Sequence, residues 1–357
     1  IIDDILDLSK IESGKLDIEL TRCNVIDIVE DVIDLLAPIA YEKNIELFYH
    51  LDENVPHIIE SDPVRVRQVL LNLVGNAVKF TLNGYVFLNI VPDNNNDIYR
   101  IKFTVADTGI GMNQDSKQKL FSAFTQADTS ITRNFGGTGL GLVISRKLVL
   151  LMKGEIGFDS TIGEGSTFWF TVPVNVISKS SEGRVDELIG KNIALIDDHV
   201  LCRRSLKSML EQWGCKVNEY NLERCITDKL FTDNNSTNAI VIGISRKYMQ
   251  QIDQYSNCLN QLSDATPVMT IASTRSYTEL GELSSGGLCN LTFRTARRSH
   301  IRNSLVDCIN GTSTLMGETH EDEKLTEALF NPSLKVLVVD DNDINLRLAE
   351  IILKKNN

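Results

Sequence analysis

Amide side chains and one lysine follow one side of a helix-like segment, residues 64–80. Asn72, Asn76 and Lys79 recur there at i+3 and i+4 spacing, opposite a stripe of valine, leucine and alanine. An Asp-Pro pair at 62–63 suits the N-cap and the first position of a helix. Asparagine is a poor helix former, but its carboxamide oxygen is a ligand for Mg²⁺, and a lysine complements phosphate. The pattern predicts a helix that holds Mg²⁺ and phosphate, with an ordinary solvated face as the alternative.

A carboxylate ends a strand-like run in VADTGIGM, residues 105–112. Asp107 is followed there by Gly109 and Gly111, a spacing that by itself is common in turns. An ionised carboxylate at this place is able to accept a hydrogen bond from an exocyclic amine, which distinguishes adenine from guanine. Asp107 is therefore a candidate for binding a nucleotide base.

The glycine-rich stretch FGGTGLGL, residues 135–142, precedes an apolar run. It lacks the Lys-Ser/Thr ending of a P-loop, and the spacing of Gly137, Gly139 and Gly141 differs from the dinucleotide fingerprint. The stretch opens a helix, whose N–H groups and positive end attract anionic phosphates. Glycine is equally the usual solution to a tight turn, so this stretch alone leaves both interpretations open. A further motif, GEGSTFWF at 163–170, is a turn that enters a strand.

The elements around these motifs alternate in two ways. Up to about residue 176, helical periods at 24–43 and 64–80 are interleaved with strand-like runs at 85–91 and 99–107. This order predicts an α+β two-layer sandwich with helices on one face of a sheet. Beyond a polar linker, short apolar strands separated by helix-length segments predict a doubly wound parallel α/β sheet.

Composition limits the function further. The formal net charge of −12 argues against a nucleic-acid surface, because backbone binding requires clustered lysine and arginine. The cysteines are scattered and never spaced C-x-x-C, so we expect free thiols in a reducing compartment. No segment of the sequence approaches the ~20 apolar residues of a membrane span. The chain starts and stops within helix-like segments, and we expect it to be a piece of a longer protein.

Together, NLVGNAVKFT, DTGIGM, LFSAFTQAD and GGTGLGL resemble the ATP-binding domain of sensor histidine kinases, within the wider family of gyrase, Hsp90 and MutL. The resemblance covers about residues 1–176 and implies ATP and Mg²⁺ as ligands. It assigns Asn76 to the Mg²⁺ ion, Asn72 to catalytic assistance on the phosphate side, and Lys79 to catalysis and to contact with the phosphates.

The same resemblance assigns the other contacts with ATP. Asp107 would bind the adenine amine with support from Thr167, and Gly109 and Gly111 would line this part of the site. The residues expected to face the phosphates are Gly137, Thr138, Gly139, Leu140 and Gly141.

A mobile lid is expected between residues 112 and 138. Phe121 and Phe124 would be its aromatic anchors, and Arg133 is a candidate phosphate contact. Asn134 stands where such kinases often carry a second basic residue, so we expect weaker lid electrostatics here.

Residues 191–311 resemble a response-regulator receiver. Such a domain needs an acidic pair for Mg²⁺, an acceptor Asp after the third strand, a Thr or Ser after the fourth and a Lys after the fifth. Asp197 and Asp198 supply the pair. The acceptor, hydroxyl and lysine positions hold, in that order, Gly243, Ala272 and Arg294. Without a carboxylate nucleophile no acyl phosphate forms, so we expect a degenerate receiver that packs against its neighbours or regulates them.

The terminal VLVVDDNDINLRLAE resembles the first strand and helix of a second, truncated receiver. Asp340 and Asp341 would hold its Mg²⁺, Asn345 fits the same pattern, and the acceptor Asp is expected beyond Asn357. This order of domains resembles the tripartite hybrid sensor histidine kinases of the BarA/GacS type, with a histidine phosphotransfer domain further on.

The resemblance also implies limits for the domains. The expected parts are the end of the second dimerisation helix (1–20), the ATP-binding domain (21–176), a linker (177–190), the degenerate receiver (191–311), a second linker (312–333) and the start of the second receiver (334–357).

The phosphoacceptor histidine of this family lies on the first dimerisation helix, in a run like HExRTP that this chain lacks. We therefore expect the chain to bind ATP with Mg²⁺ without phosphorylating itself on histidine. The histidines present stand in other contexts and are expected to be ordinary surface or packing residues: His50, His57, His199, His300 and His320.

The expected reaction is transfer of the ATP γ-phosphoryl to a histidine and then to an aspartate. The implied partners are a second copy of the full-length protein as a homodimer, a response regulator and a histidine phosphotransfer domain. Contact with the membrane is expected only through segments outside this chain, which would be the cytoplasmic portion of an inner-membrane protein. The alternatives are a conformational ATPase of the Hsp90 or MutL kind and a nucleotide-binding scaffold without catalysis.

Overall fold

The computed structural model of the chain contains two compact units, Ile1–Ser313 and Thr314–Asn357. The second unit lies outside the residues that the structure describes. Those residues are 2–93, 98–120, 140–178, 185–220, 237–245, 266–273 and 290–311.

One layer of the amino-terminal domain is a five-stranded mixed sheet with the strand order β2-β4-β5-β7-β6. The pairs β4–β5, β5–β7 and β6–β7 are antiparallel, and β2 pairs with β4 in parallel. The strands are β2 (Ile45–Leu51), β4 (Gly84–Asp93), β5 (Arg100–Asp107), β6 (Ile156–Thr161) and β7 (Gly165–Pro173).

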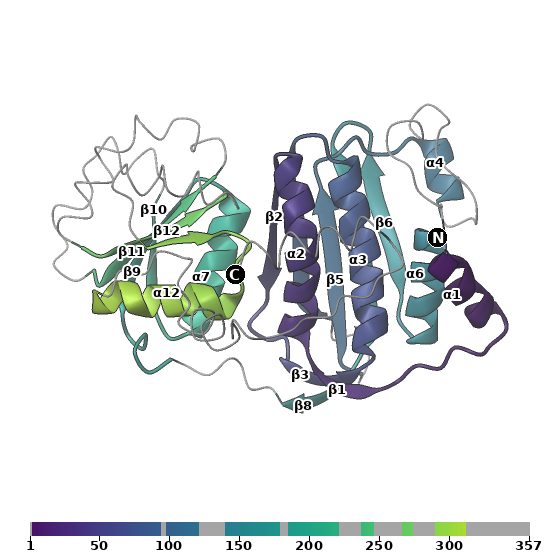
Figure 1. Ribbon diagram of the computed structural model, residues 1–357, viewed down its shortest axis with the longest axis horizontal. Helices are drawn as coiled ribbons and strands as arrows, with labels where there is room; N and C mark the ends of the chain where they lie inside the picture. Colours follow the sequence, from purple (N-terminus) through teal and green to yellow (C-terminus); the bar gives the residue numbers. More distant parts are fainter. Residues whose placement is uncertain are drawn as a thin grey trace, which may run out of the picture. The chain divides into compact units, whose positions relative to one another are not determined.

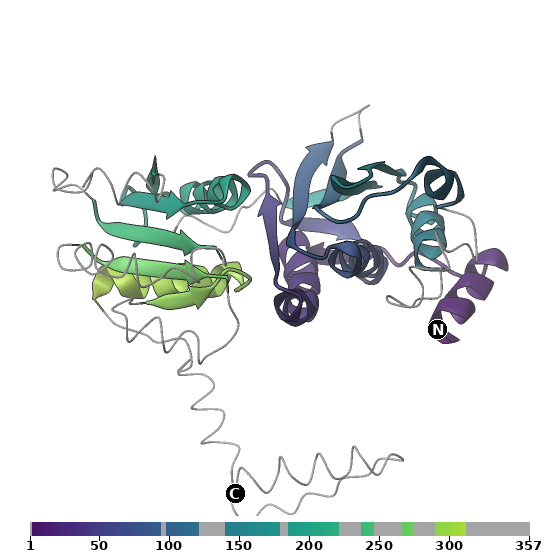
Figure 2. The same cartoon turned by 90° about the horizontal axis from the view of Figure 1, so that it is seen from above.

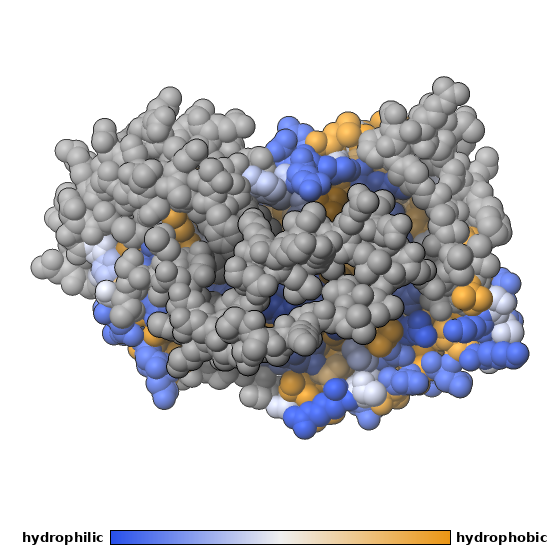
Figure 3. Space-filling view, viewed as in Figure 1, coloured by the Kyte–Doolittle hydropathy of each residue, from blue (hydrophilic) through white to orange (hydrophobic). Residues whose placement is uncertain are grey.

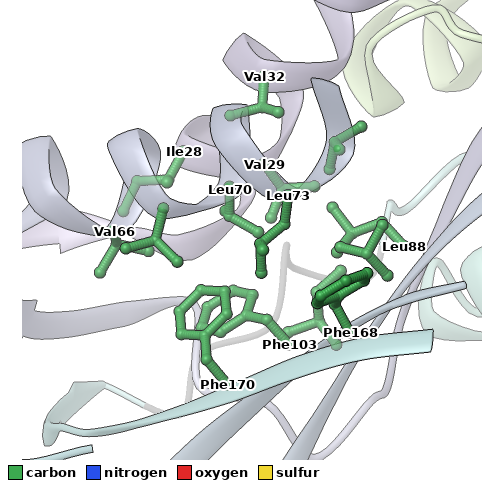
Figure 4. Packing of buried hydrophobic residues seen from close by; sticks show 14 of the residues in the cluster. Ile28, Val29, Val32, Val66, Leu70, Leu73, Leu88, Phe103, Phe168 and Phe170 are labelled. Carbon is green, nitrogen blue, oxygen red and sulfur yellow. The ribbon is translucent and has the colours of Figure 1, made fainter. Parts of the chain in front are cut away.

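Helices form the second layer of this domain. Figure 1 shows α2 (Val25–Glu42) and α3 (Pro63–Phe80) lying along one face of the sheet, with α6 (Gly141–Leu151) beside them. In Figure 4, Val29, Leu70 and Leu73 of the helices point toward side chains of the sheet. Phe103 and Phe170 of the sheet stack with ring centroids 4.8 Å apart. This apolar layer confirms the predicted α+β two-layer sandwich.

A small antiparallel sheet closes one end of the domain. Its strands are β1 (Thr21–Asn24), β3 (Ile58–Ser61) and β8 (Asn175–Ser178), in that order. β8 continues two residues past the expected limit at 176, because its backbone pairs with β3. Two further helices are α1 (Ile2–Glu12) and α4 (Gln114–Lys119).

The second sheet is parallel throughout. Its order is β10-β9-β11-β12-β13, and every neighbouring pair is parallel. Figure 2 shows α7 (Val200–Gln212) on one side of this sheet and α12 (Arg298–Asn310) on the other. The predicted doubly wound arrangement is thus confirmed. The strands are β9 (Asn192–Asp197), β10 (Lys216–Tyr220), β11 (Ala239–Ile244), β12 (Val268–Ala272) and β13 (Leu291–Phe293).

The described surface has a mixed character. On the face that Figure 3 shows, hydrophilic and hydrophobic residues are interspersed wherever residues are coloured. Within the ranges that the structure covers, no helix is long and apolar enough to cross a membrane.

Helix α3 begins at a residue that has three separate backbone partners. Asp62 is almost fully buried, and its Oδ1 accepts hydrogen bonds from the backbone N–H groups of Val64 and Arg65 at 3.1 and 3.0 Å. Its Oδ2 accepts a third bond, from the N–H of Glu19 at 3.1 Å. Asp62 therefore caps α3, as the sequence predicts, and also ties the preceding segment to the start of this helix.

Replacing Asp62 by alanine should lower the free energy of unfolding by about 2 kcal/mol, because the helix loses its N-cap and the N–H of Glu19 loses its acceptor. Denaturant unfolding measures this change. Asp62→Asn is the matched control, since asparagine caps helices as well as aspartate does. Equal stability of the two variants would contradict the capping role.

Candidate functional site

Packing decides which way the polar face of α3 points. Val69 and Leu73 are fully buried on the side that faces the sheet. The helix period then turns Asn72, Asn76 and Lys79 away from the core, where each is only partly buried. The sequence prediction that one side of this helix is for packing and the other for polar contacts is confirmed.

The two asparagines are joined to each other and to α6. Asn76 Nδ2 donates to Asn72 Oδ1 at 3.2 Å, and Asn72 Nδ2 donates to Ser145 Oγ at 2.8 Å. A Cβ on Gly141 would overlap Asn72 Oδ1, so glycine is what lets the first turn of α6 approach α3. Because the amide nitrogen of Asn76 is used inside the protein, its carboxamide oxygen is the atom that suits a metal ion.

The amino-terminal end of α6 lies against this face. Its N-cap residue, Leu140, has no oxygen in its side chain and makes no side-chain capping bond. The side chain of Leu140 is buried in the core, so any contact of this residue with a phosphate must come from its backbone. A helix start without a side-chain cap has N–H groups that suit an anion.

Two lysines raise the positive potential at the carboxyl end of α3. Lys43 Nζ donates to the backbone oxygens of Val78 and Lys79 at 3.0 and 2.8 Å. Burial, and then repulsion from Lys43, lower the pKa of Lys79 from its ordinary value. An arriving anion is favoured here, because a phosphate would relieve the repulsion between the two ammonium groups.

Asp107 is a buried carboxylate at the end of β5. Its Oδ1 accepts hydrogen bonds from the backbone N–H groups of Gly109 at 2.8 Å and Ser166 at 3.2 Å. Burial raises the pKa of the Asp107 carboxyl, and the two backbone bonds oppose this only in part. Both bonds use Oδ1, which leaves Oδ2 for the amine of a ligand.

The glycines after Asp107 join this carboxylate to α3. The backbone oxygen of Phe80, at the end of α3, accepts from the N–H of Ile110 at 3.4 Å. A Cβ on Gly109 would lie 2.6 Å from that same oxygen. Gly111 has φ +65°, a conformation that glycine adopts without strain. The backbone that follows Asp107 therefore contacts the carboxyl end of α3.

The expectation for Thr167 is wrong, and the register of the strands gives the reason. Ser166 pairs with Asp107, whereas Thr167 pairs with Ala106. Because side chains alternate along a strand, Ser166 shares the face of Asp107, and Thr167 lies on the opposite face of the sheet. The hydroxyl of Ser166 is also 3.0 Å from that of Ser160.

Sequence reasoning missed Ser166 although a signal was present. Phe168 and Phe170 alternate as buried residues along β7, and counting back by two from Phe168 reaches Ser166. Ser145 and Lys43 were also missed, because they come from segments far from the motifs and only the fold brings them to α3.

Several expected contacts lie outside the described residues. They are Arg133, Gly137, Thr138 and Gly139 of the ATP site, Phe121, Phe124 and Asn134 of the expected lid, and Asp340, Asp341 and Asn345 of the truncated receiver.

Three of the histidines have structural roles. His57 is buried, and its backbone oxygen accepts from the N–H of Val25 at 2.9 Å. His199 caps α7 through its ring nitrogen, which accepts from the N–H of Cys202 at 3.4 Å. Burial lowers the pKa of His199 and of His50, so both favour the neutral form.

The residues expected at the receiver-type site also converge. The register places Gly243 of β11 beside Asp197 of β9, and Ile244 beside Ala272 of β12. Arg294 follows β13, and its Nη1 lies 2.9 Å from Asp197 Oδ2. These positions share the carboxyl edge of the parallel sheet, where the alignment by sequence placed them.

Comparison with known proteins agrees with this geometry. Residues 61–176 match the family described as histidine kinase-, DNA gyrase B- and HSP90-like ATPase. This segment contains α3, Asp107 and the start of α6, and it is therefore an ATPase domain of that family.

The wider chain is similar to curated sensor histidine kinases over nearly its whole length. It is 34% identical to sensor histidine kinase GacS of Pseudomonas protegens over 99% of this chain and 38% of that protein. It is 30% identical to signal transduction histidine-protein kinase BarA of Shigella flexneri, also over 99% of this chain and 38% of that protein. The chain thus spans well under half the length of these curated relatives.

A solved structure shows similarity over the same extent. The crystal structure of full-length ShkA in complex with AMPPNP aligns with a TM-score of 0.67 and 25% identity, covering 99% of this chain and 69% of that chain.

Ser166→Ala should weaken ATP binding about five-fold, because it removes a hydroxyl on the face of the sheet that carries Asp107. Thr167→Ala is the matched control one residue away, and its affinity should equal that of the unchanged protein. Titration with a fluorescent ATP analogue measures both variants. A loss in Thr167→Ala without a loss in Ser166→Ala would contradict the register.

Proposed function

We propose that this chain is the ATP-binding catalytic core of a hybrid sensor histidine kinase. The observation that carries this proposal is the close approach of three parts of the chain. The segment at Gly109, after Asp107, lies against the backbone of Phe80 at the end of α3, and Gly141 at the start of α6 lies against the side chain of Asn72. Asp107 suits the base of a nucleotide, and the polar face of α3 suits phosphates together with their metal ion. The start of α6 suits the anionic end of the same nucleotide.

The proposed roles follow from the groups present. Asp107 Oδ2 accepts the adenine amine, which guanine lacks at that position. The α6 N-terminus and Lys79 attract the phosphates. Asn76 Oδ1 would hold the Mg²⁺ ion that accompanies ATP, and this ion would neutralise charge on the phosphoryl group being transferred. Asn72 holds Asn76 in place and would assist at the phosphates.

The acceptor of the γ-phosphoryl group is proposed to be a histidine that this chain does not contain. His50, His57 and His199 are occupied as packing or capping residues in the described part of the chain. The phosphoryl group would then pass to an aspartate, through a histidine phosphotransfer domain and a response regulator. We propose that the whole protein is a membrane-anchored homodimer whose kinase part lies in the cytoplasm.

Asp107→Asn should weaken ATP binding on the order of 100-fold, because an amide replaces the carboxylate that accepts the adenine amine. Titration with a fluorescent ATP analogue tests this. Asp159→Asn on neighbouring β6 is the matched control, since Asp159 is exposed and pairs with Thr167 on the other face. Unchanged affinity in Asp107→Asn would contradict the assigned site.

Stability and pH give Asp107→Asn a second readout. Because burial raises the pKa of Asp107, its charged form is disfavoured in the folded protein and costs stability once the pH exceeds that pKa. The variant should therefore be at least as stable as the unchanged protein at neutral pH. In the unchanged protein, ATP affinity should fall with decreasing pH as Asp107 becomes protonated, at a higher pH than for an ordinary carboxyl.

The isolated chain should bind ATP without acquiring acid-labile phosphate, which is the mark of phosphohistidine. Incubation with ATP labelled at the γ-phosphoryl group, followed by acid and alkali treatment, measures this. A longer form that supplies the preceding dimerisation helix should become labelled. Acid-labile phosphate on the isolated chain would contradict the absence of an acceptor, and steady release of free phosphate without labelling of the longer form would indicate an ATPase instead.

A further inference from the structure

The carboxyl edge of the parallel sheet carries two adjacent carboxylates, Asp197 and Asp198, and we call it the acidic edge. Resemblance to receivers implies that Asp197 and Asp198 hold a Mg²⁺ ion here. The partners of each carboxylate oxygen, and the space around these oxygens, decide whether such an ion fits.

Asp197 has an internal partner for each oxygen. Its side chain is completely buried, and Oδ2 lies 2.9 Å from Nη1 of Arg294, whose side chain is 5% exposed. Its Oδ1 accepts from the backbone N–H of His199 at 2.8 Å. A divalent cation would have to displace a buried guanidinium group that already neutralises this carboxylate.

Arg294 is a permanent cation. A guanidinium group stays protonated in proteins, and the one of Arg294 faces the Asp197 carboxylate. The positive charge that a metal ion would bring is therefore already present at every pH.

Asp198 is left with little to offer a metal. Its Oδ2 accepts from Ser245 Oγ at 2.6 Å, and only its Oδ1 lacks a hydrogen-bond partner among the described residues. Mg²⁺ requires six oxygen ligands in a near-octahedral arrangement. In the part of the chain that the structure covers, no group of three or more acidic, histidine or cysteine residues is placed to hold a metal ion.

Gly243 shows that the edge is built around the ion pair. It occupies the position of the missing acceptor aspartate, and a Cβ at this position would overlap Asp197 Oδ2. In the arrangement that pairs with Arg294, Asp197 takes up the space that an acceptor side chain needs. The residues present therefore do not fit a Mg²⁺ ion.

We propose that Arg294 replaces the divalent cation in this domain, and that its ion pair with Asp197 keeps the acidic edge permanently closed to Mg²⁺. The domain is then held in one state by its own side chains, where a receiver would change state with metal and phosphoryl group.

The ion pair also lies next to a segment through which this domain contacts the ATPase domain within the same compact unit. Just after Arg294, Arg297 forms ion pairs with Asp31 and Asp34 of α2 at 2.9 and 2.8 Å. The backbone N–H of Arg298 donates to Glu30 Oε1 at 2.7 Å. A closed acidic edge thus keeps these contacts available without a phosphorylation step.

The test is a Mn²⁺ titration of the nucleotide-free full chain, followed by the broadening of backbone amide signals in NMR. Asp340→Asn and Asp341→Asn are included in every sample, so that the acidic pair at 340–341 contributes no metal site. With Arg294 present, the amides of Asp197 and Gly243 should broaden no more than the amides of acidic residues on the surface. Selective broadening at low Mn²⁺ concentration would overturn the proposal.

The variant Arg294→Met tests the proposal from the opposite direction, because it removes the cation that is proposed to replace Mg²⁺. Removing the cation leaves a buried carboxylate uncompensated, so the thermal midpoint of the domain should fall by several degrees and recover in part with Mg²⁺. Arg297→Met is the matched control, because it removes an arginine three residues away that does not touch Asp197, and it should show no response to Mg²⁺. A folded Arg294→Met variant that gains no response to Mg²⁺ would also contradict the proposal. If this variant fails to fold, the Mn²⁺ titration of the protein that retains Arg294 decides alone.

Discussion

The packing of α3 on the mixed sheet is the constraint on which the proposed ATP site depends. Leu70, Leu73 and their neighbours are buried against the sheet, and this burial sets the rotation of the helix about its axis. That rotation turns two amides and a lysine away from the core, and it brings Asn72 against the start of α6. A site assembled in this way needs no flexible side chain to find its place, because the apolar core has already positioned each group.

Buried charged groups have different partners in the two domains. In the ATPase domain, Asp107 is desolvated but keeps one oxygen for a ligand, and Lys79 lies near a second lysine that raises its energy in the absence of an anion. In the parallel-sheet domain, the buried Asp197 carboxylate is paired with Arg294 and with the backbone N–H of His199. Because an unsatisfied buried charge is costly and a satisfied one is stable, the first arrangement favours binding and the second favours a fixed state.

Much of the fold could be predicted because its signals are local. Residues 64–80 carry a full amphipathic period with an N-cap and a proline before it, and the helix found is Pro63–Phe80. The central strands β9, β11 and β12 of the parallel sheet are short and mostly apolar because both of their faces are covered. The end of the ATPase domain was less predictable: β8 extends to Ser178 through pairing with β3, and the polar residues there carry no local sign of that partner.

The sequence by itself determined which residues are able to do chemistry: the amides of one helix, a carboxylate before glycines, and an acidic pair without its acceptor aspartate. Only the tertiary structure decided which of them act together. Strand register placed Ser166, and not Thr167, on the face of Asp107. The parallel sheet brought the carboxyl ends of β9 and β13 to the same edge, where the side chain of Arg294 reaches Asp197. The physical reason is that register and ion pairing depend on residues distant in the chain, whose separation in space is set by packing of the whole core.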